Sequence, residues 1–246
     1  MEIQRDEQHL MSDEENSFVR FLDIAGHDLR NPITVLKSQV QLLQRRLGRE
    51  GGRDDDLRDL GRMAYQIERL NVGLDTFLEA ARIAQGRFSL ILEMCDLCAV
   101  SRRLAAIYGS ASRAHTVMFE LPDDPIIASW DTARVELALA ALLANALKFS
   151  TQGEIRVKVT REPSFARVSV TDTGVGVPRG EEATIFEPYI SGSNIENPGV
   201  GLGLYVAREI VREHGGDIGV ISVEDGGTTF WFTLPLAGAV NGEAFS

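Results

Sequence analysis

The first third of the chain carries a nearly regular seven-residue pattern of apolar side chains. From Phe18 to Leu47 the apolar positions are separated by 4, 3, 4, 4, 3, 4, 3 and 4 residues. A second run, from Leu57 to Ala81, repeats at 3, 4, 3, 4, 3, 4 and 3, with Asn71 as its one polar position. Spacings that alternate between three and four place side chains on one stripe of an α-helix. A cluster of glycine and charged residues over residues 48–56 separates the runs, which is typical of a turn with an aspartate as cap for the next helix. The pattern predicts two long antiparallel helices with a short connection.

A lone helical hairpin of this kind buries little core, because each helix has only one apolar stripe. A second copy of the hairpin would complete a four-helix bundle and cover both stripes. We therefore expect a homodimer through residues 18–85. The alternative is that the stripes pack on the remainder of the same chain.

Beyond Gln85 and Gly86 the pattern changes to short β-like runs separated by shorter helices. The expected strands are Phe88–Leu92, Thr116–Leu121, Ile126–Ser129, Glu154–Thr160, Ala166–Thr171, Asp217–Val223 and Thr228–Leu234. The expected helices are Leu97–Tyr108, Thr132–Phe149 and Gly203–His214. The middle helix is apolar almost all round and should be buried. This order predicts an α+β fold with one mixed sheet and helices on one face, and it divides the chain into domains at residues 1–86 and 87–246.

Composition narrows the class of protein. The chain has 246 residues, 44% of them hydrophobic, which is enough to build cores and excludes a wholly disordered chain. A formal net charge of -11 argues against a nucleic-acid partner and against docking on an anionic membrane. No apolar run approaches the roughly 20 residues that a membrane span requires, and the start lacks the apolar core of a secretory signal. We therefore expect no membrane span in this chain and a cytoplasmic location.

The two cysteines, Cys95 and Cys98, are separated by two residues. This spacing occurs in redox motifs and in halves of zinc sites, but there is no second cysteine pair. We favour the interpretation that Asp96 caps a helix and that the cysteines are small apolar residues beside it.

His27 lies beside the first apolar stripe, which passes through Ala25 and Leu29, so its side chain should face solvent. Pro32 lies five residues later and favours a local kink. An exposed imidazole next to Asp28 can act as a nucleophile if the carboxylate takes or orients its proton. By itself, a solvent-facing histidine is usually an ordinary surface residue.

The segment His-Asp-Leu-Arg-Asn-Pro at 27–32 resembles the phospho-acceptor box of two-component sensor histidine kinases. The resemblance implies that His27 is phosphorylated and that Asp28 acts as the base. It also implies that Asn31 orients a water that removes phosphate from a partner's aspartate. Asp28 stands where many members of this family have glutamate.

Three further segments carry residues suited to a nucleotide. On the buried helix, Asn145 can offer an amide oxygen to Mg²⁺, and Lys148, one turn later, can meet a phosphate. A single asparagine in a helix is otherwise a hydrogen-bonded core residue.

The second segment, Asp172–Pro178, directly follows an expected strand. A carboxylate at a strand end can accept a hydrogen bond from an adenine amino group, and Gly174 and Gly176 let the backbone approach a ligand. The third segment, Gly199–Leu204, has glycine at every second position and opens a helix. Such a turn presents backbone N–H groups and the positive end of the helix dipole to phosphate.

Between these two segments lie residues 178–198, which include Phe186 and show little regular pattern. A stretch of this length without secondary structure is uncommon and is often an active-site cover. We interpret it as a lid over a bound ligand.

Taken in order, these segments resemble the histidine kinase core over residues 18–236. The resemblance implies that residues 1–86 are a dimerisation and histidine phosphotransfer hairpin. It implies that residues 87–246 are a catalytic ATP-binding domain, an α/β sandwich of the Bergerat or GHKL type. In that fold Asp172 would hold adenine, Asn145 would bind Mg²⁺, and the glycines would form lid and phosphate contacts. The implied ATP-binding residues are Asn145, Lys148, Phe149, Asp172, Gly174, Gly176, Phe186, Gly199, Gly201, Leu202, Gly203 and Leu204. Ala141 departs from the family, which often has a second polar residue there.

The expected function is ATP-dependent autophosphorylation of His27, followed by phosphotransfer to an aspartate of a response-regulator receiver domain, with phosphatase activity as well. Transfer between domains requires a hinge, for which Gln85-Gly86 is the candidate.

The alternative functions are a phosphotransfer or scaffold protein that has lost ATP turnover, a related ATPase or protein kinase of the same fold, and a structural dimeriser. Only about 17 residues precede the first helix, so sensing input should come from a partner or from a longer parent chain.

Overall fold

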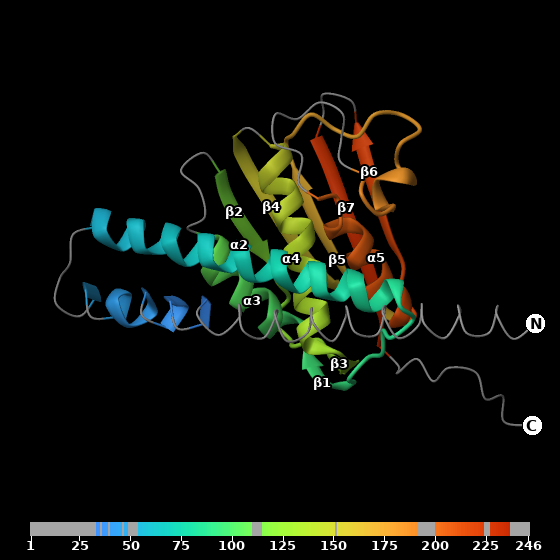
Figure 1. The fold of residues 1–246 in the computed structure, drawn as a ribbon, viewed down its shortest axis with the longest axis horizontal. Coiled ribbons are helices and arrows are strands. Elements are labelled where there is room, and N and C mark those ends of the chain that lie inside the picture. Colours follow the sequence, from blue (N-terminus) through green and yellow to red (C-terminus); the bar gives the residue numbers. More distant parts are fainter. Residues whose placement is uncertain are drawn as a thin grey trace, which may run out of the picture.

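The computed structural model describes residues 33–48 except 35, 39 and 46, and residues 54–109, 115–150, 152–190, 200–223 and 227–236. The described residues of 33–48 are helical. They run antiparallel to the long helix α2 (Asp54–Ala84), beside which they lie (Figure 1). Lys37 of the first segment forms an ion pair of 2.5 Å with Glu68 of α2. The predicted helical hairpin is confirmed over these residues.

The rest of the chain is built on a five-stranded mixed sheet with the strand order β2-β4-β5-β7-β6. The strands are β2 (His115–Glu120), β4 (Gly153–Arg161), β5 (Phe165–Asp172), β6 (Ile218–Val223) and β7 (Gly227–Pro235). β2 pairs with β4 in parallel, and the other neighbouring strands are antiparallel. Along β4, the fully buried Ile155 and Val157 alternate with exposed residues, as expected for a sheet with one covered face.

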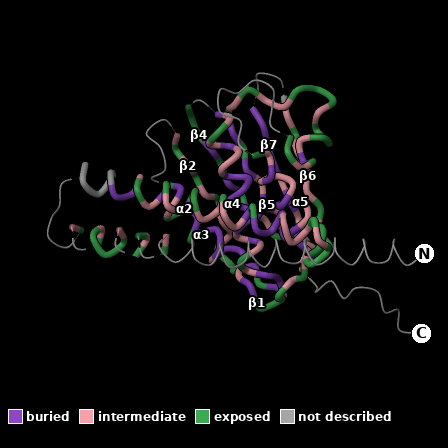
Figure 2. The backbone as a smooth tube through the Cα atoms, in the orientation of Figure 1, coloured by how far each residue is buried: buried purple, intermediate pink, exposed green. Residues whose placement is uncertain are grey.

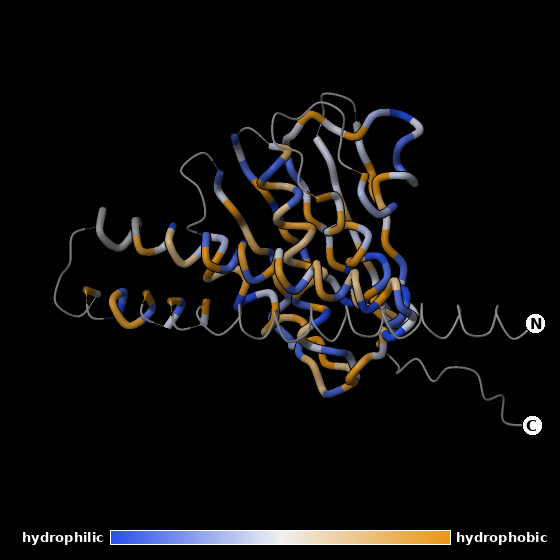
Figure 3. Tube along the Cα trace, in the orientation of Figure 1, coloured by the Kyte–Doolittle hydropathy of each residue, from blue (hydrophilic) through white to orange (hydrophobic). Residues whose placement is uncertain are grey.

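Three helices cover that face of the sheet: α3 (Leu97–Tyr108), α4 (Thr132–Phe149) and α5 (Gly203–Glu213) (Figure 1). The buried residues gather where these helices meet the sheet (Figure 2). α4 is apolar over most of its length, whereas apolar and polar positions alternate along α2 (Figure 3). This arrangement confirms the predicted α+β fold and the buried position of the middle helix.

One predicted strand is wrong. Phe88–Leu92 has no regular structure, and the strand β1 begins afterwards, at Glu93–Asp96. β1 pairs with β3 (Ile127–Trp130) in a separate two-stranded sheet, so the part of the chain described contains two sheets rather than one. The physical reason lies in side-chain contacts from the start of α4. The Asp131 carboxylate accepts the Ile91 N–H at 2.9 Å, and the Arg134 guanidinium covers the Phe88 ring.

The cysteines lie where the capping interpretation places them. The Asp96 side chain accepts the Cys98 backbone N–H at 2.9 Å and so caps α3. Cys95 and Cys98 are both free and buried. Burial raises the pKa of both thiols, which favours the unreactive protonated form.

α2 packs with one side against the sheet domain of the same chain. It contacts α3, α4 and α5, and its residues Tyr65 and Ala80 join their buried core. Met63, Leu70 and Phe77, spaced seven residues apart, remain exposed on α2. Packing within one chain therefore covers only part of the apolar surface of this helix.

Candidate nucleotide-binding site

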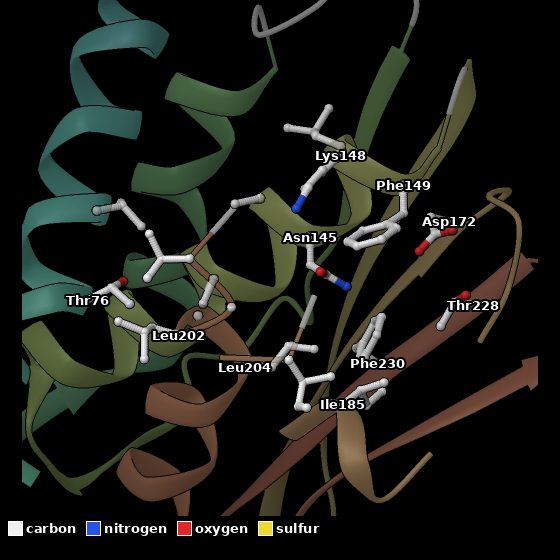
Figure 4. A pocket seen from close by; sticks show the side chains of 18 of the residues that line it. Thr76, Asn145, Lys148, Phe149, Asp172, Ile185, Leu202, Leu204, Thr228 and Phe230 are labelled. Carbon is white, nitrogen blue, oxygen red and sulfur yellow. The ribbon is translucent and has the colours of Figure 1, made fainter. Parts of the chain in front are cut away.

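A cavity of about 940 Å³ lies between α2, α4, the start of α5 and the strands β5 and β7. Asp172 and Thr228 lie at one end of it and Thr76 of α2 at the other, with Asn145 and Lys148 between them (Figure 4). The volume is within the range of small-molecule sites, and the wall is mostly apolar with a few polar groups.

Asp172, the last residue of β5, is 3% exposed. Its carboxylate accepts the Gly174 N–H at 2.8 Å and a further hydrogen bond from the Thr228 backbone. Burial raises the pKa of this carboxyl, and the two hydrogen bonds oppose the shift. A Cβ at Gly174 would meet the Phe149 carbonyl oxygen at 2.6 Å and Asp172 Oδ1 at 2.7 Å. Glycine is therefore required for the turn that holds this carboxylate in place.

Asn145, Lys148 and Phe149 belong to the last two turns of α4 and line the cavity. Lys148 Nζ lies 5.0 Å from the centre of the Phe149 ring. Burial lowers the pKa of Lys148. Among the residues described in the wall, Lys148 and Arg69 of α2 are the cationic side chains.

The glycine-rich segment forms the entrance to α5. Gly201 has φ +72, and a Cβ there would meet the Ile190 carbonyl oxygen at 2.6 Å. Leu202 is the N-cap residue of α5 and Gly203 its first residue, and both line the cavity together with Leu204. A Cβ at Gly203 would lie 3.8 Å from Ala141 of α4. The helix N-terminus, with its backbone N–H groups, thus opens at the cavity, which suits an anionic ligand.

The structure brings together most of the predicted ATP-binding residues but not all of them. Gly174 and Phe186 are absent from the described cavity wall. Phe186 lies in the short 3₁₀ helix η1 (Thr184–Phe186) and packs edge-on against Phe230, with ring centres 6.4 Å apart. It therefore supports a wall residue and does not itself line the cavity.

Several wall residues were not predicted. Thr228 lines the cavity because it lies directly opposite Asp172 in the pairing of β5 with β7. Phe230, two residues later on the same face of β7, lines the cavity as well. Ile185 comes from η1. From α2 come Tyr65, Arg69, Val72, Gly73, Thr76 and Phe77. The apolar alternation of β7 is a weak signal for Phe230, whereas nothing local in α2 indicates that it borders this cavity.

The predicted phospho-acceptor residues His27, Asp28 and Asn31, together with Gly199, lie outside the described residues. Their roles stay predictions.

Two family models match the chain over complementary segments. The model for the His Kinase A (phospho-acceptor) domain matches residues 19–86. The model for histidine kinase-, DNA gyrase B-, and HSP90-like ATPases matches residues 130–238, which include the cavity residues of α4, β5, α5 and β7. The chain belongs to the sensor histidine kinases. The ATPase match also supports ATP binding by the C-terminal part of this histidine kinase.

Curated relatives agree with this assignment. The sensor protein KdpD of Escherichia coli (strain K12) is 32% identical over 228 residues, which cover 89% of this chain and 24% of that protein. The alginate biosynthesis sensor protein KinB of Pseudomonas aeruginosa is 30% identical over 217 residues, which cover 86% of this chain and 36% of that protein. The chain thus spans less than two fifths of the length of these two relatives.

Solved structures show the same fold. The mycobacterial sensor histidine kinase MprB is 25% identical with a TM-score of 0.53, and the match covers 60% of this chain and 99% of that chain. The full-length ShkA in complex with AMPPNP is 24% identical with a TM-score of 0.61, covering 89% of this chain and 46% of that one. The match to ShkA supports the fold alone.

The residues present suit a magnesium ion bound mainly by a nucleotide. Among the residues that the structure describes, no group of three or more His, Cys, Asp or Glu side chains is placed to hold a metal ion. Mg²⁺ in nucleotide sites usually has few protein ligands and takes the remainder from phosphates and water. The Asn145 amide oxygen at the cavity wall fits that role.

No helix in the described part of the chain is long and apolar enough to cross a membrane.

Proposed function

We propose that this chain is the catalytic core of a sensor histidine kinase that transfers the γ-phosphoryl group of ATP to His27. The observation that carries the proposal is the composition of the cavity wall. It combines a buried, oriented Asp172 carboxylate with Asn145, Lys148 and a glycine turn at a helix N-terminus. This wall occurs in a chain that also matches a phospho-acceptor domain.

In this proposal the adenine lies at the end of the cavity formed by Asp172 and Thr228. The Asp172 carboxylate accepts a hydrogen bond from the adenine amino group, and Ile185 and Phe230 supply apolar contacts to the base. The phosphates then lie toward Lys148 and the start of α5, where a cation and backbone N–H groups oppose their charge. A bound Mg²⁺ would be held by the Asn145 amide oxygen and the phosphates, and would neutralise charge on them.

The proposed chemistry is a single phosphoryl transfer. A nitrogen of the His27 imidazole attacks the γ-phosphorus as the bond to the β,γ-bridging oxygen breaks, and ADP leaves. Asp28 takes or orients the proton on the other ring nitrogen. The protein contributes mainly by positioning the two groups and by stabilising the charge on the transferring phosphoryl group.

The proposed acceptor of the phosphoryl group is an aspartate of a response-regulator receiver domain. The phosphoryl group moves from the His27 nitrogen to a carboxylate oxygen of that aspartate, and Asn31 orients the water for the later hydrolysis.

ATP as substrate and two free buried thiols suit a cytoplasmic, reducing location.

We further propose that two copies pair through residues 18–85. The exposed Met63 and Leu70 support this, because they lie seven residues apart along α2 and so share one stripe that a second hairpin would cover.

Incubation with γ-labelled ATP tests the proposed function. The expected result is a label on the protein that acid removes and that base does not, as for phosphohistidine. His27→Gln should abolish the label and leave nucleotide binding unchanged, while Asp172→Asn should weaken both. Label transfer to an added receiver domain would test the partner.

Two outcomes would favour the alternatives. Nucleotide binding without any label on the wild-type protein would indicate a phosphotransfer or scaffold protein, for which Ala141 is the sequence argument. An acid-stable label that persists in His27→Gln would indicate a kinase that acts on hydroxyl side chains.

A further inference from the structure

Glu181 is a second carboxylate in the wall of the nucleotide cavity, in addition to Asp172. It lies in the turn between Pro178, another wall residue, and η1, and its backbone N–H donates to the Pro178 carbonyl oxygen at 3.1 Å. The Glu181 carbonyl oxygen accepts the backbone N–H groups of Thr184 and Ile185, each at 3.0 Å. The main chain of Glu181 is therefore held on both sides, which fixes the point where its side chain meets the cavity.

The side chain of Glu181 has no partner in the part of the chain that the structure describes. No hydrogen bond or ion pair from a described residue reaches its carboxylate, although the residue is half-buried. The Asp172 carboxylate, by contrast, accepts two backbone N–H groups. A carboxylate that is partly removed from water without a partner is unfavourable. Glu181 is therefore suited to a ligand that donates hydrogen bonds to it.

The charges in the cavity wall match the groups of ATP. Apart from tyrosines, the ionisable side chains of the described wall are Arg69, Lys148, Asp172 and Glu181. The two cations suit the phosphates, which would repel a carboxylate. The hydrogen-bond donors of ATP are the adenine amino group and the two ribose hydroxyls. With the amino group on Asp172, the hydroxyls remain for Glu181.

We propose that Glu181 accepts hydrogen bonds from the ribose 2′ and 3′ hydroxyls and so makes the site selective for ribonucleotides. The inference rests on the proposed function, because it takes ATP as the ligand. In that function Ile185, whose N–H is bonded to the Glu181 carbonyl oxygen, contacts the base, so Glu181 lies toward the adenine end, where the sugar follows. Carboxylates bind ribose hydroxyls in the dinucleotide sites of other folds by the same chemistry.

Calorimetry with ADP and with 2′,3′-dideoxy-ADP, both without Mg²⁺, tests the proposal. Wild type should bind ADP about tenfold more tightly than dideoxy-ADP, because a charged acceptor strengthens a hydrogen bond. Glu181→Ala should reduce this ratio to less than about twofold. Glu181→Gln, which keeps an acceptor and loses the charge, should give an intermediate ratio. Taking the ratio of two affinities cancels any general effect of the lost charge on the phosphates.

Glu182→Ala is the matched control. Glu182 is the next residue, carries the same charge and is exposed. Its carboxylate accepts the Gly180 N–H at 2.8 Å, and the residue is absent from the described cavity wall. This control should keep the ratio within about twofold of wild type. Retained binding of dideoxy-ADP by each variant shows that the variant is folded.

Each result decides the matter. A wild-type ratio near one, or a ratio that persists in Glu181→Ala, would overturn the ribose contact while leaving ATP binding in place. Equal weakening of both nucleotides in Glu181→Ala would also overturn it, because the carboxylate would then act on a part of the nucleotide that the two share. If wild type binds neither nucleotide, the proposed function is wrong and the ribose contact falls with it.

Discussion

Asp172 and Thr228 lie directly opposite each other on the adjacent strands β5 and β7, and the Thr228 backbone donates a hydrogen bond to the Asp172 carboxylate. Two residues 56 positions apart in the sequence thus form one end of the nucleotide cavity. With the Gly174 N–H bound to the same carboxylate, the group is fixed before any ligand arrives. Such preorganisation reduces the entropy lost on binding.

Asp172→Asn should weaken nucleotide binding by about 10- to 100-fold, because hydrogen bonds to charged groups contribute about 1.5–3 kcal/mol each. The amide also replaces one acceptor with a donor that faces the backbone N–H groups. Calorimetry with AMPPNP measures the effect. Thr229→Val is the matched control, since it removes the Thr171–Thr229 hydroxyl contact of 2.9 Å on the other face of the same two strands. Wild-type affinity in Asp172→Asn would contradict the adenine position.

Gly174→Ala should destabilise the protein by about 1–3 kcal/mol and weaken nucleotide binding, because the new methyl group would meet the Phe149 carbonyl oxygen at 2.6 Å. Gly73→Ala in α2 should do the opposite for stability, adding about 0.5–1 kcal/mol, since nothing lies within 4 Å of its Cβ position. Urea unfolding compares the two free energies of unfolding. A loss at Gly73 equal to that at Gly174 would show that the close contact is not the cause.

Stability should fall as the pH is lowered through the titration of His214. His214 is 3% exposed; its Nε2 accepts the Asp131 N–H at 2.9 Å and its Nδ1 bonds to the Ile210 carbonyl oxygen at 2.7 Å. Burial lowers the pKa of His214 in the folded state. Because the unfolded chain takes up a proton near its ordinary pKa of about 6.5, the stabilising contribution is complete above that pH and is lost as the pH falls toward the depressed pKa.

The measurement is the free energy of unfolding by urea from about pH 7.5 to about pH 5, a range that brackets the unfolded-state pKa of histidine. Wild type should lose stability across this range more steeply than His214→Gln, which lacks the titrating group. Parallel curves for the two proteins would exclude His214 as the source of the slope.

Met63→Glu combined with Leu70→Glu should convert the protein from dimer to monomer, because two carboxylates would lie in the stripe that we expect the second hairpin to cover. Light scattering at several protein concentrations gives the mass. Met118→Glu on β2, where the native side chain is 48% exposed, serves as the control and should leave the mass unchanged. An unchanged mass in the double variant would place the dimer contact elsewhere.

The elements that depend on local periodicity and on caps follow from the amino-acid sequence alone. The helical hairpin, the buried helix α4 and the capping role of Asp96 all follow from patterns within a few turns of chain. The glycine segments were also recognisable from their spacing along the chain. The periodicity and the cap act between neighbours in the chain, whereas the atoms that a Cβ would meet at Gly174 and Gly201 belong to Phe149 and Ile190, which lie further away in the sequence.

The features that join distant segments depend on how the elements pack in three dimensions. Phe88–Leu92 has strand-like side chains, yet contacts from Asp131 and Arg134 hold its backbone out of the sheet. Thr228 entered the nucleotide site through strand register, and Thr76 and Phe77 entered it through the packing of α2 on α4 and α5. The physical reason is that burial and ion pairing across 55 residues, as between Glu79 and Arg134, depend on how the elements pack. The periodicity of any one element does not contain that information.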